Sequence, residues 1–91
     1  MKFVHSCTHD HAKEWDIITD AGVDIGTLRS EVYDANDRGS TRTREWRVDG
    51  YEVEIYCGDK SITRYFRVST WGTPAKAREA AKEYARDWEE A

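Results

Sequence analysis

Length, composition and charge exclude several classes of protein for this 91-residue chain. The length has room for one domain and not for two. Hydrophobic residues make up 38% of the chain and are regularly spaced, which excludes a disordered polymer, and a formal net charge of −4 argues against non-specific binding to nucleic acid.

The cysteines and the first residues bear on the compartment. Cys7 and Cys57 are too few for a disulfide framework, and free thiols are typical of the reducing cytoplasm. Residues 1–7 hold no apolar run long enough for a signal peptide, and no segment approaches the length of a membrane span. We therefore expect a soluble cytoplasmic domain that contacts no membrane.

The first forty residues are acidic, with four basic and eight acidic side chains, and predict strands and loops. The apolar runs 15–18 and 23–25 predict a hairpin. The apolar positions then change from odd to even numbers across Gly26, which indicates a β-bulge. A short helix that begins at Thr27 is the alternative. Residues 36–40 predict a loop in either case.

Histidine and cysteine alternate near the N-terminus, at His5, Cys7, His9 and His11. Alternate residues of a strand share a face, and imidazole and thiolate groups are zinc ligands. Such residues lie roughly 6–7 Å apart, however, so four in a row cannot converge on one ion. A metal site would need two or three of them and a distant ligand, which is the alternative. We expect an ordinary polar strand or loop, with no metal and no other cofactor.

Residues 41–72 lean basic, with six basic and five acidic side chains, and predict a three-stranded antiparallel meander. Asp49-Gly50 is a strong signal for a tight hairpin turn, which would place Arg47 opposite Glu52. Gly58-Asp59-Lys60 marks the next turn, and Ile62–Ser69 the third strand. Alternation places one set of side chains toward the core: Trp46, Val48, Tyr51, Val53, Ile55, Cys57, Ile62, Phe66 and Val68. It places a second set on the other face: Glu45, Arg47, Glu52, Glu54, Tyr56, Thr63, Tyr65 and Arg67.

Residues 73–90 predict an amphipathic helix. Thr73 is a good N-cap, and Pro74 suits the first helical position. An apolar stripe with helical spacing follows: Ala77, Ala80, Ala81, Tyr84, Ala85 and Trp88. The expected fold is therefore α+β, a single domain over residues 1–91. Its antiparallel sheet has four to five strands, and one C-terminal helix packs on one face of the sheet.

The C-terminal half also carries a family resemblance. Its residues are Tyr65-Phe66-Arg67-Val68, Trp71-Gly72, Ala77, Ala80, Tyr84 and Arg86. They resemble the end of the DNA-binding domain of plant ethylene-response factors, and more closely its relatives in apicomplexan transcription factors and phage integrase arms. The resemblance implies three antiparallel strands with one helix behind.

The same resemblance implies that the exposed sheet face enters the DNA major groove. The matching residues would be Arg47, Tyr56, Tyr65 and Arg67, with Lys60 and Arg64 nearby. The chain departs from the family pattern at Glu45, Glu52 and Glu54, because a carboxylate on that face repels every phosphate.

The sequence shows no catalytic constellation such as a Ser-His-Asp order, a glycine-rich phosphate cradle or a separated carboxylate pair. We expect no enzyme and no small-molecule substrate. The first hypothesis is a binding protein that occupies a protein surface, of the kind a phage or plasmid carries to inhibit a host defence complex of the CRISPR type. The second is a sequence-specific DNA-binding domain.

Both hypotheses use one set of candidate residues on the exposed sheet face: Arg47, Glu52, Glu54, Tyr56, Tyr65 and Arg67. Tyr, Trp and Arg dominate the binding energy of protein interfaces, so Tyr56 and Tyr65 are the centre of this set. If the acidic first forty residues cover that face instead, both tyrosines are simply core.

Overall fold

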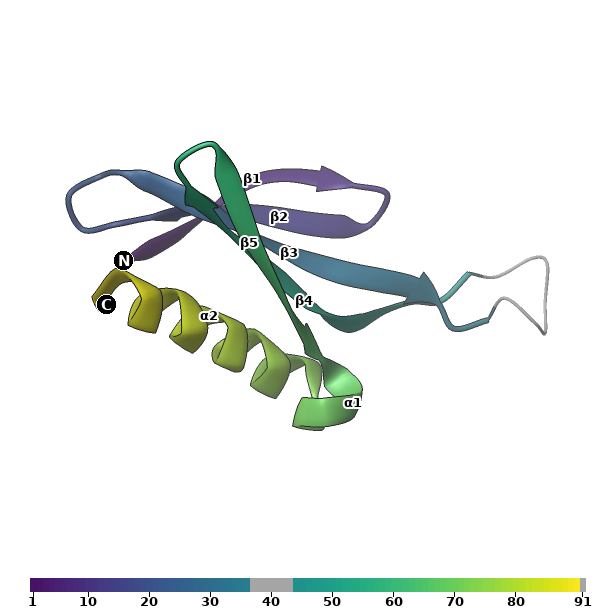
Figure 1. Ribbon diagram of the computed structural model, residues 1–91. Helices are drawn as coiled ribbons and strands as arrows, with labels where there is room; N and C mark the ends of the chain where they lie inside the picture. The colour runs from purple at the N-terminus through teal and green to yellow at the C-terminus, as the bar shows by residue number, and fades with distance from the viewer. Residues whose placement is uncertain (37–43, 91) are drawn as a thin grey trace.

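The computed structural model describes residues 1–36 and 44–90, with side chains through Trp88. Its elements in chain order are β1 (Lys2–His9), β2 (Ala12–Ile18), β3 (Asp24–Asp34), β4 (Trp46–Cys57), β5 (Lys60–Arg67), α1 (Val68–Trp71) and α2 (Pro74–Glu90). The strands form one antiparallel sheet in the order β1-β2-β3-β4-β5 (Figure 1). The expected α+β fold is confirmed.

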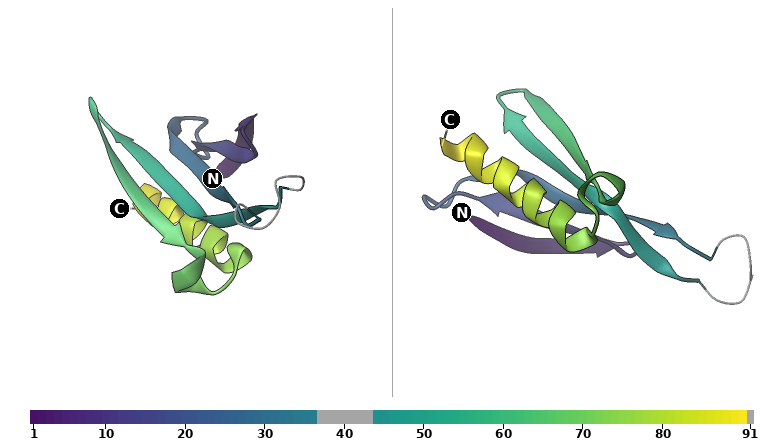
Figure 2. Two further views of the ribbon diagram at one scale, coloured as in Figure 1. Left: turned by 90° about the vertical axis from the view of Figure 1, so that its right-hand side faces the viewer. Right: turned by 90° about the horizontal axis from the view of Figure 1, so that it is seen from below.

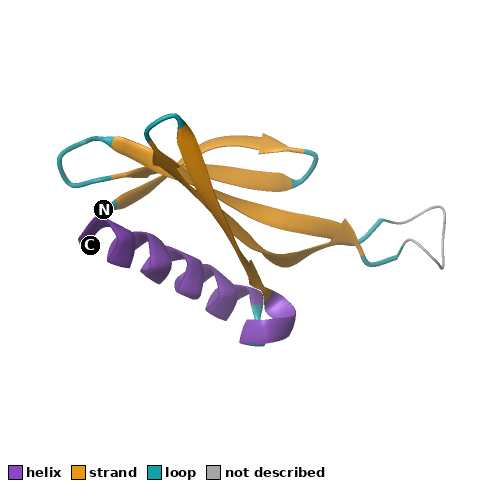
Figure 3. Cartoon of the chain, in the orientation of Figure 1, coloured by secondary structure: helices purple, strands orange, loops and turns teal. Residues whose placement is uncertain are grey.

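Helix α2 packs against one face of this sheet, chiefly over β4 and β5 (Figures 2 and 3). Among the described residues, these apolar side chains are buried in the core between them: Ile17, Leu28, Tyr51, Val53, Ile55, Phe66, Ala77, Ala81 and Ala85. The helix contributes only alanines to this buried set. Small side chains let a helix lie close to a sheet, so a thin core is still well packed.

The start of α2 follows the sequence prediction. The backbone N–H of Lys76 donates a hydrogen bond of 3.1 Å to the hydroxyl oxygen of Thr73, which is the expected N-cap. Pro74 is the first helical residue. The short helix α1 links β5 to α2 and places Trp71 beside Phe66, with ring centroids 6.3 Å apart.

The predicted hairpin turn at Asp49-Gly50 is wrong, because β4 runs through both residues without turning. Gly50 pairs with Glu31 and Val48 pairs with Val32, so Asp49 is the extra residue of a β-bulge. Gly50 lacks the positive φ that a primed turn requires. A side chain there would have its Cβ 2.7 Å from the carbonyl oxygen of Phe66, so glycine permits a close approach of backbone.

The next turn is tighter than a three-residue loop. Cys57 pairs with Lys60, so Gly58 and Asp59 alone make the turn, with Gly58 at a φ of 66°. Strand β5 ends at Arg67, and Val68 already belongs to α1, so the third strand predicted over Ile62–Ser69 begins and ends earlier. This register sets Glu52 opposite Tyr65.

The hairpin predicted within the first forty residues is confirmed by β2 and β3, and so is the bulge near Gly26. The register shifts where Ile17 and Ile18 pair with Gly26 and Asp24. The alternative of a short helix from Thr27 is wrong, because β3 continues to Asp34. Of the loop predicted at 36–40, residues 37–40 lie outside the described part of the chain.

The histidine and cysteine alternation does not give one shared face, since β1 has a bulge between His5 and Cys7. The His5 ring packs against Trp15 on the side of α2, at 6.1 Å between centroids. The Cys7 sulfur lies 3.6 Å from a carboxylate oxygen of Glu14 on the other side. In the described residues, no three His, Cys, Asp or Glu side chains gather closely enough to hold a metal ion.

Candidate partner-binding face

We call the sheet surface opposite α2 the outer face. Side chains of a strand alternate between the two faces, so the outer face holds the residues between the buried core positions. They are Glu14 and Asp16 of β2; Thr27, Arg29 and Glu31 of β3; Arg47, Glu52, Glu54 and Tyr56 of β4; and Thr63, Tyr65 and Arg67 of β5.

No described element covers this face. Strands β1 to β3 extend the sheet sideways, and α2 lies on the opposite side (Figure 2). The side chains of Tyr56 and Tyr65 are 47% and 55% exposed. The interpretation in which the first forty residues bury these tyrosines is therefore wrong.

One row of paired residues crosses the middle of the outer face: Glu14, Arg29, Glu52 and Tyr65. A guanidinium nitrogen of Arg29 lies 3.1 Å from a carboxylate oxygen of Glu52. The Glu52 side chain is only 12% exposed, because its neighbours on both strands crowd it. The expected pairing of Glu52 with Arg47 is wrong, since no hairpin joins those residues.

Glu31 adds a further carboxyl group near Glu52, beside this row. Burial raises the pKa of Glu31, and a hydrogen bond and charge repulsion from Glu52 raise it further. The guanidinium groups of Arg29 and Arg67 oppose this shift without cancelling it. The carboxyl groups of Glu31 and Glu52 therefore lie close enough to repel each other when both are ionised, despite the arginines beside them.

A parallel row runs through Asp16, Thr27, Glu54 and Thr63. The Ser61 hydroxyl donates a hydrogen bond of 2.9 Å to the Glu54 carboxylate, which holds that side chain in place. Burial raises the pKa of the neighbouring Tyr56, and the carboxylates of Asp24 and Glu54 raise it further. The Tyr56 hydroxyl thus lies in a negative potential.

The guanidinium groups at the centre of the face contact acidic groups of the chain itself. The Arg67 guanidinium lies 5.7 Å from the centre of the Tyr65 ring and 3.7 Å from a carboxylate oxygen of Asp49. Arg29 pairs with Glu52, as described above. Each guanidinium would have to leave an acidic neighbour to meet a phosphate.

Arg47 lies apart from the other candidates. Two of its guanidinium nitrogens donate hydrogen bonds to Glu45, at 3.0 and 2.6 Å. It lies five residues before Glu52 on the same strand, which is about 15 Å. Arg64, expected near the DNA-binding residues, points to the inner face, with its guanidinium 5.4 Å from the centre of the Tyr84 ring.

The structure thus gathers five of the six predicted residues: Glu52, Glu54, Tyr56, Tyr65 and Arg67. Sequence reasoning missed the acidic groups of the neighbouring strands, Glu14, Asp16 and Glu31, together with Arg29. Alternation with the buried Ile17 and Leu28 was the available signal, but which strand lies beside β4 was not evident.

Comparison of the chain with protein-family models, with curated proteins and with solved structures found no match. Across residues 1–36 and 44–90, no helix is long and apolar enough to cross a membrane. Function has to be inferred from the geometry and charge of the outer face, because a fold alone does not define it.

Proposed function

We propose that this chain is a small non-catalytic binding protein whose outer face occupies a basic surface of a protein partner. The observation that carries the proposal is the charge of that face. Arg29 and Arg67 are the guanidinium groups near its centre. Five carboxyl groups lie around them: Glu14, Asp16, Glu31, Glu52 and Glu54. Complementary charge steers partners together and selects among them.

The exposed tyrosines can contribute binding energy that charge alone does not supply. Tyr56 and Tyr65 lie among the carboxyl groups, and Tyr is enriched among the residues that contribute most to binding energy. The ring of Tyr65 is held by Arg67, which limits the entropy lost when a partner orders it. A mixed face of this kind suits a protein surface.

The partner that we propose is a protein surface that ordinarily holds nucleic acid. Fixed carboxylates can compete with phosphates there, and defence complexes of the CRISPR type hold their nucleic acids in a positively charged channel. The chain would then be an inhibitor of the kind that phages and plasmids carry. It would act in the cytoplasm, where the free thiols of Cys7 and Cys57 are stable.

A sequence-specific DNA-binding domain is the second candidate, and the resemblance described above favours it. The resemblance rests on the C-terminal half of the chain, which contains β4, β5 and α2. The acidic centre of the outer face weighs against this candidate, because every carboxylate there opposes the phosphate contacts that supply affinity.

The first experiment is a fluorescence-anisotropy titration of the purified protein against a mixed-sequence DNA duplex at low and near-physiological salt. We expect no binding at either salt concentration. Binding that weakens steeply with salt would replace this proposal with the DNA-binding one. In that case Arg67→Ala would flatten the salt dependence, while Glu54→Gln would leave binding unchanged or stronger.

The second experiment measures displacement of a labelled duplex from purified CRISPR effector complexes by this protein. We expect Tyr65→Ala to weaken displacement roughly tenfold, and Glu54→Gln to weaken it severalfold. Arg47→Ala is the matched control, because Arg47 lies outside the central cluster and should change little. Equal losses in all three variants, or no displacement from any complex, would contradict the proposal.

A further inference from the structure

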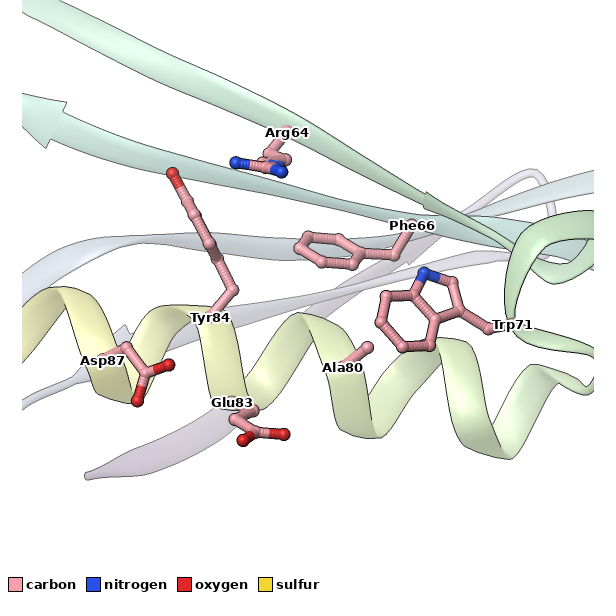
Figure 4. Close-up of a pocket in the computed structure, with 7 residues that line it drawn as sticks. All are labelled: Arg64, Phe66, Trp71, Ala80, Glu83, Tyr84 and Asp87. Carbon is pink, nitrogen blue, oxygen red and sulfur yellow. The ribbon is translucent and has the colours of Figure 1, made fainter.

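A groove of about 340 Å³ lies on the other side of the sheet, between α2 and the edge strand β5 (Figure 4). Its walls are the rings of Phe66, Trp71 and Tyr84. Phe66 lies in the middle, with ring centroids 6.3 Å from Trp71 and 5.6 Å from Tyr84. Phe66 is buried, whereas Trp71 is 45% exposed.

The two rims of the groove carry opposite charges. On the strand side, the guanidinium of Arg64 lies over the Tyr84 ring. On the helix side, Glu83 and Asp87 lie one turn apart and so share a face. Within the described part of the chain, neither carboxylate has a hydrogen-bond or ion-pair partner. Figure 4 shows both on the rim, below the aromatic rings.

The basic side chains of α2 nearest in sequence are engaged elsewhere. The ammonium of Lys82 and the guanidinium of Arg86 lie 5.3 and 5.8 Å from the centre of the Phe3 ring. Phe3 belongs to β1, at the far edge of the sheet from β5. The helix-side rim of the groove therefore keeps its negative charge.

Beside the groove, β5 has an open edge. It pairs with β4 alone, so its other edge faces no strand of the described chain. An extended segment can add to such an edge through main-chain hydrogen bonds and place alternate side chains into an adjacent pocket.

We propose that this groove binds an arginine side chain from an extended segment of a protein partner that lies along β5. The guanidinium would lie between the Trp71 ring and the Glu83 carboxylate, and Asp87 would add negative charge farther along the helix. Arginine fits better than lysine because its planar group stacks on rings and can donate two parallel hydrogen bonds to one carboxylate. Arg64 on Tyr84 is an example of the same contact within this groove. The inference is independent of the proposed function, which concerns the opposite face.

The probe is a capped pentapeptide, acetyl-Thr-Val-X-Val-Thr-amide, in which X is arginine, lysine, leucine or glutamate. Binding is followed by ¹⁵N–¹H NMR of the full chain. We expect the arginine peptide to shift the Trp71 indole N–H signal and the backbone signals of β5. We expect the leucine and glutamate peptides to bind at least about fivefold more weakly.

Matched variants test the carboxylates and the Trp71 ring of the groove separately, and they distinguish the groove from the outer face. Glu83→Gln combined with Asp87→Asn should weaken the arginine peptide on the order of fivefold. Trp71→Phe should retain part of the affinity that Trp71→Ala loses. Glu54→Gln, on the outer face, should leave peptide binding unchanged, so failure here and failure of the proposed function are distinguishable. Equal binding of the leucine and arginine peptides, or no shift with any peptide, would overturn the inference.

Discussion

Glu31 is an outer-face residue whose charged form is disfavoured by its surroundings in the folded protein. Burial raises its pKa, and Glu52 raises it further, against Arg29 and Arg67. The folded protein therefore holds this proton more tightly than the unfolded chain does. The stabilising contribution of the neutral group is fully present below the unfolded pKa, and it is lost as pH rises through the folded pKa.

Glu31→Gln removes this charge and keeps the shape of the side chain. We expect it to raise the free energy of unfolding at pH 7 by about 0.2–1 kcal/mol, the usual size of one cross-strand interaction, because it removes both the burial of the charge and its repulsion by Glu52. The gain should shrink toward zero at a pH below the unfolded pKa. Urea unfolding at pH 7 and at acidic pH measures both values. A loss of stability at pH 7 would contradict the assignment, and Glu79→Gln on the exposed side of α2 is the control.

Gly26 and Gly50 show how far single residues could be interpreted from the sequence. Both permit another strand's backbone to approach, since a Cβ at Gly26 would clash with the carbonyl oxygen of Glu54 and one at Gly50 with that of Phe66. The bulge near Gly26 was predictable because the apolar phase changes there. Gly50 follows Asp49, and that pair also signals a turn. Whether Asp49-Gly50 forms a turn or an extended strand depends on which strand lies beside it. The local sequence does not show which strand that is.

At the scale of elements, α2 was predictable almost to the residue because its signals are local. Its N-cap, first-turn proline and alanine stripe all lie within its own sequence. The order of the strands is different, because it depends on which hairpins continue into one sheet. The same holds for the candidate face. Its β4 and β5 residues could be predicted from alternation, but its β2 and β3 carboxylates could be predicted only once the order of the strands was known.

The N-cap of α2 gives a direct test at this scale. Thr73→Ala removes the acceptor for the Lys76 N–H and should lower the free energy of unfolding by about 1 kcal/mol. Thr73→Ser keeps a hydroxyl group and should lose much less. Chemical unfolding followed by circular dichroism measures both variants. Equal stability of the alanine variant and the original chain would show that the cap contributes nothing.

The molecule is elongated, with principal extents of 47 × 25 × 22 Å, and in its described residues the sheet has open edges at β1 and β5. Open edges invite pairing between copies, and native proteins oppose it with bulges and inward charges. Strand β1 has its bulge between His5 and Cys7, and β5 points the charged Arg64 toward the inner face. These features oppose pairing between copies of the chain, while the β5 edge stays open to a segment of different sequence.

Arg64→Val should therefore promote self-association through β5, because it replaces the inward charge with a residue that favours strands. Sedimentation velocity at increasing protein concentration should show dimers or larger species for this variant alone. Arg78→Val adds the same apolar group on the exposed surface of α2 and serves as the control. Equal association of both variants would indicate general stickiness and not edge pairing.

The sequential order of the strands also has a consequence for how the protein is made. Each strand pairs with its neighbour in the chain, so the sheet can grow one hairpin at a time as the ribosome releases it. The 17 residues of α2 follow all five strands and close the core last. Until then Ile17, Leu28, Val53 and Ile55 face water on one side of a finished sheet. The interval between the synthesis of β5 and the docking of α2 is thus when the nascent chain is most exposed to aggregation and to chaperones.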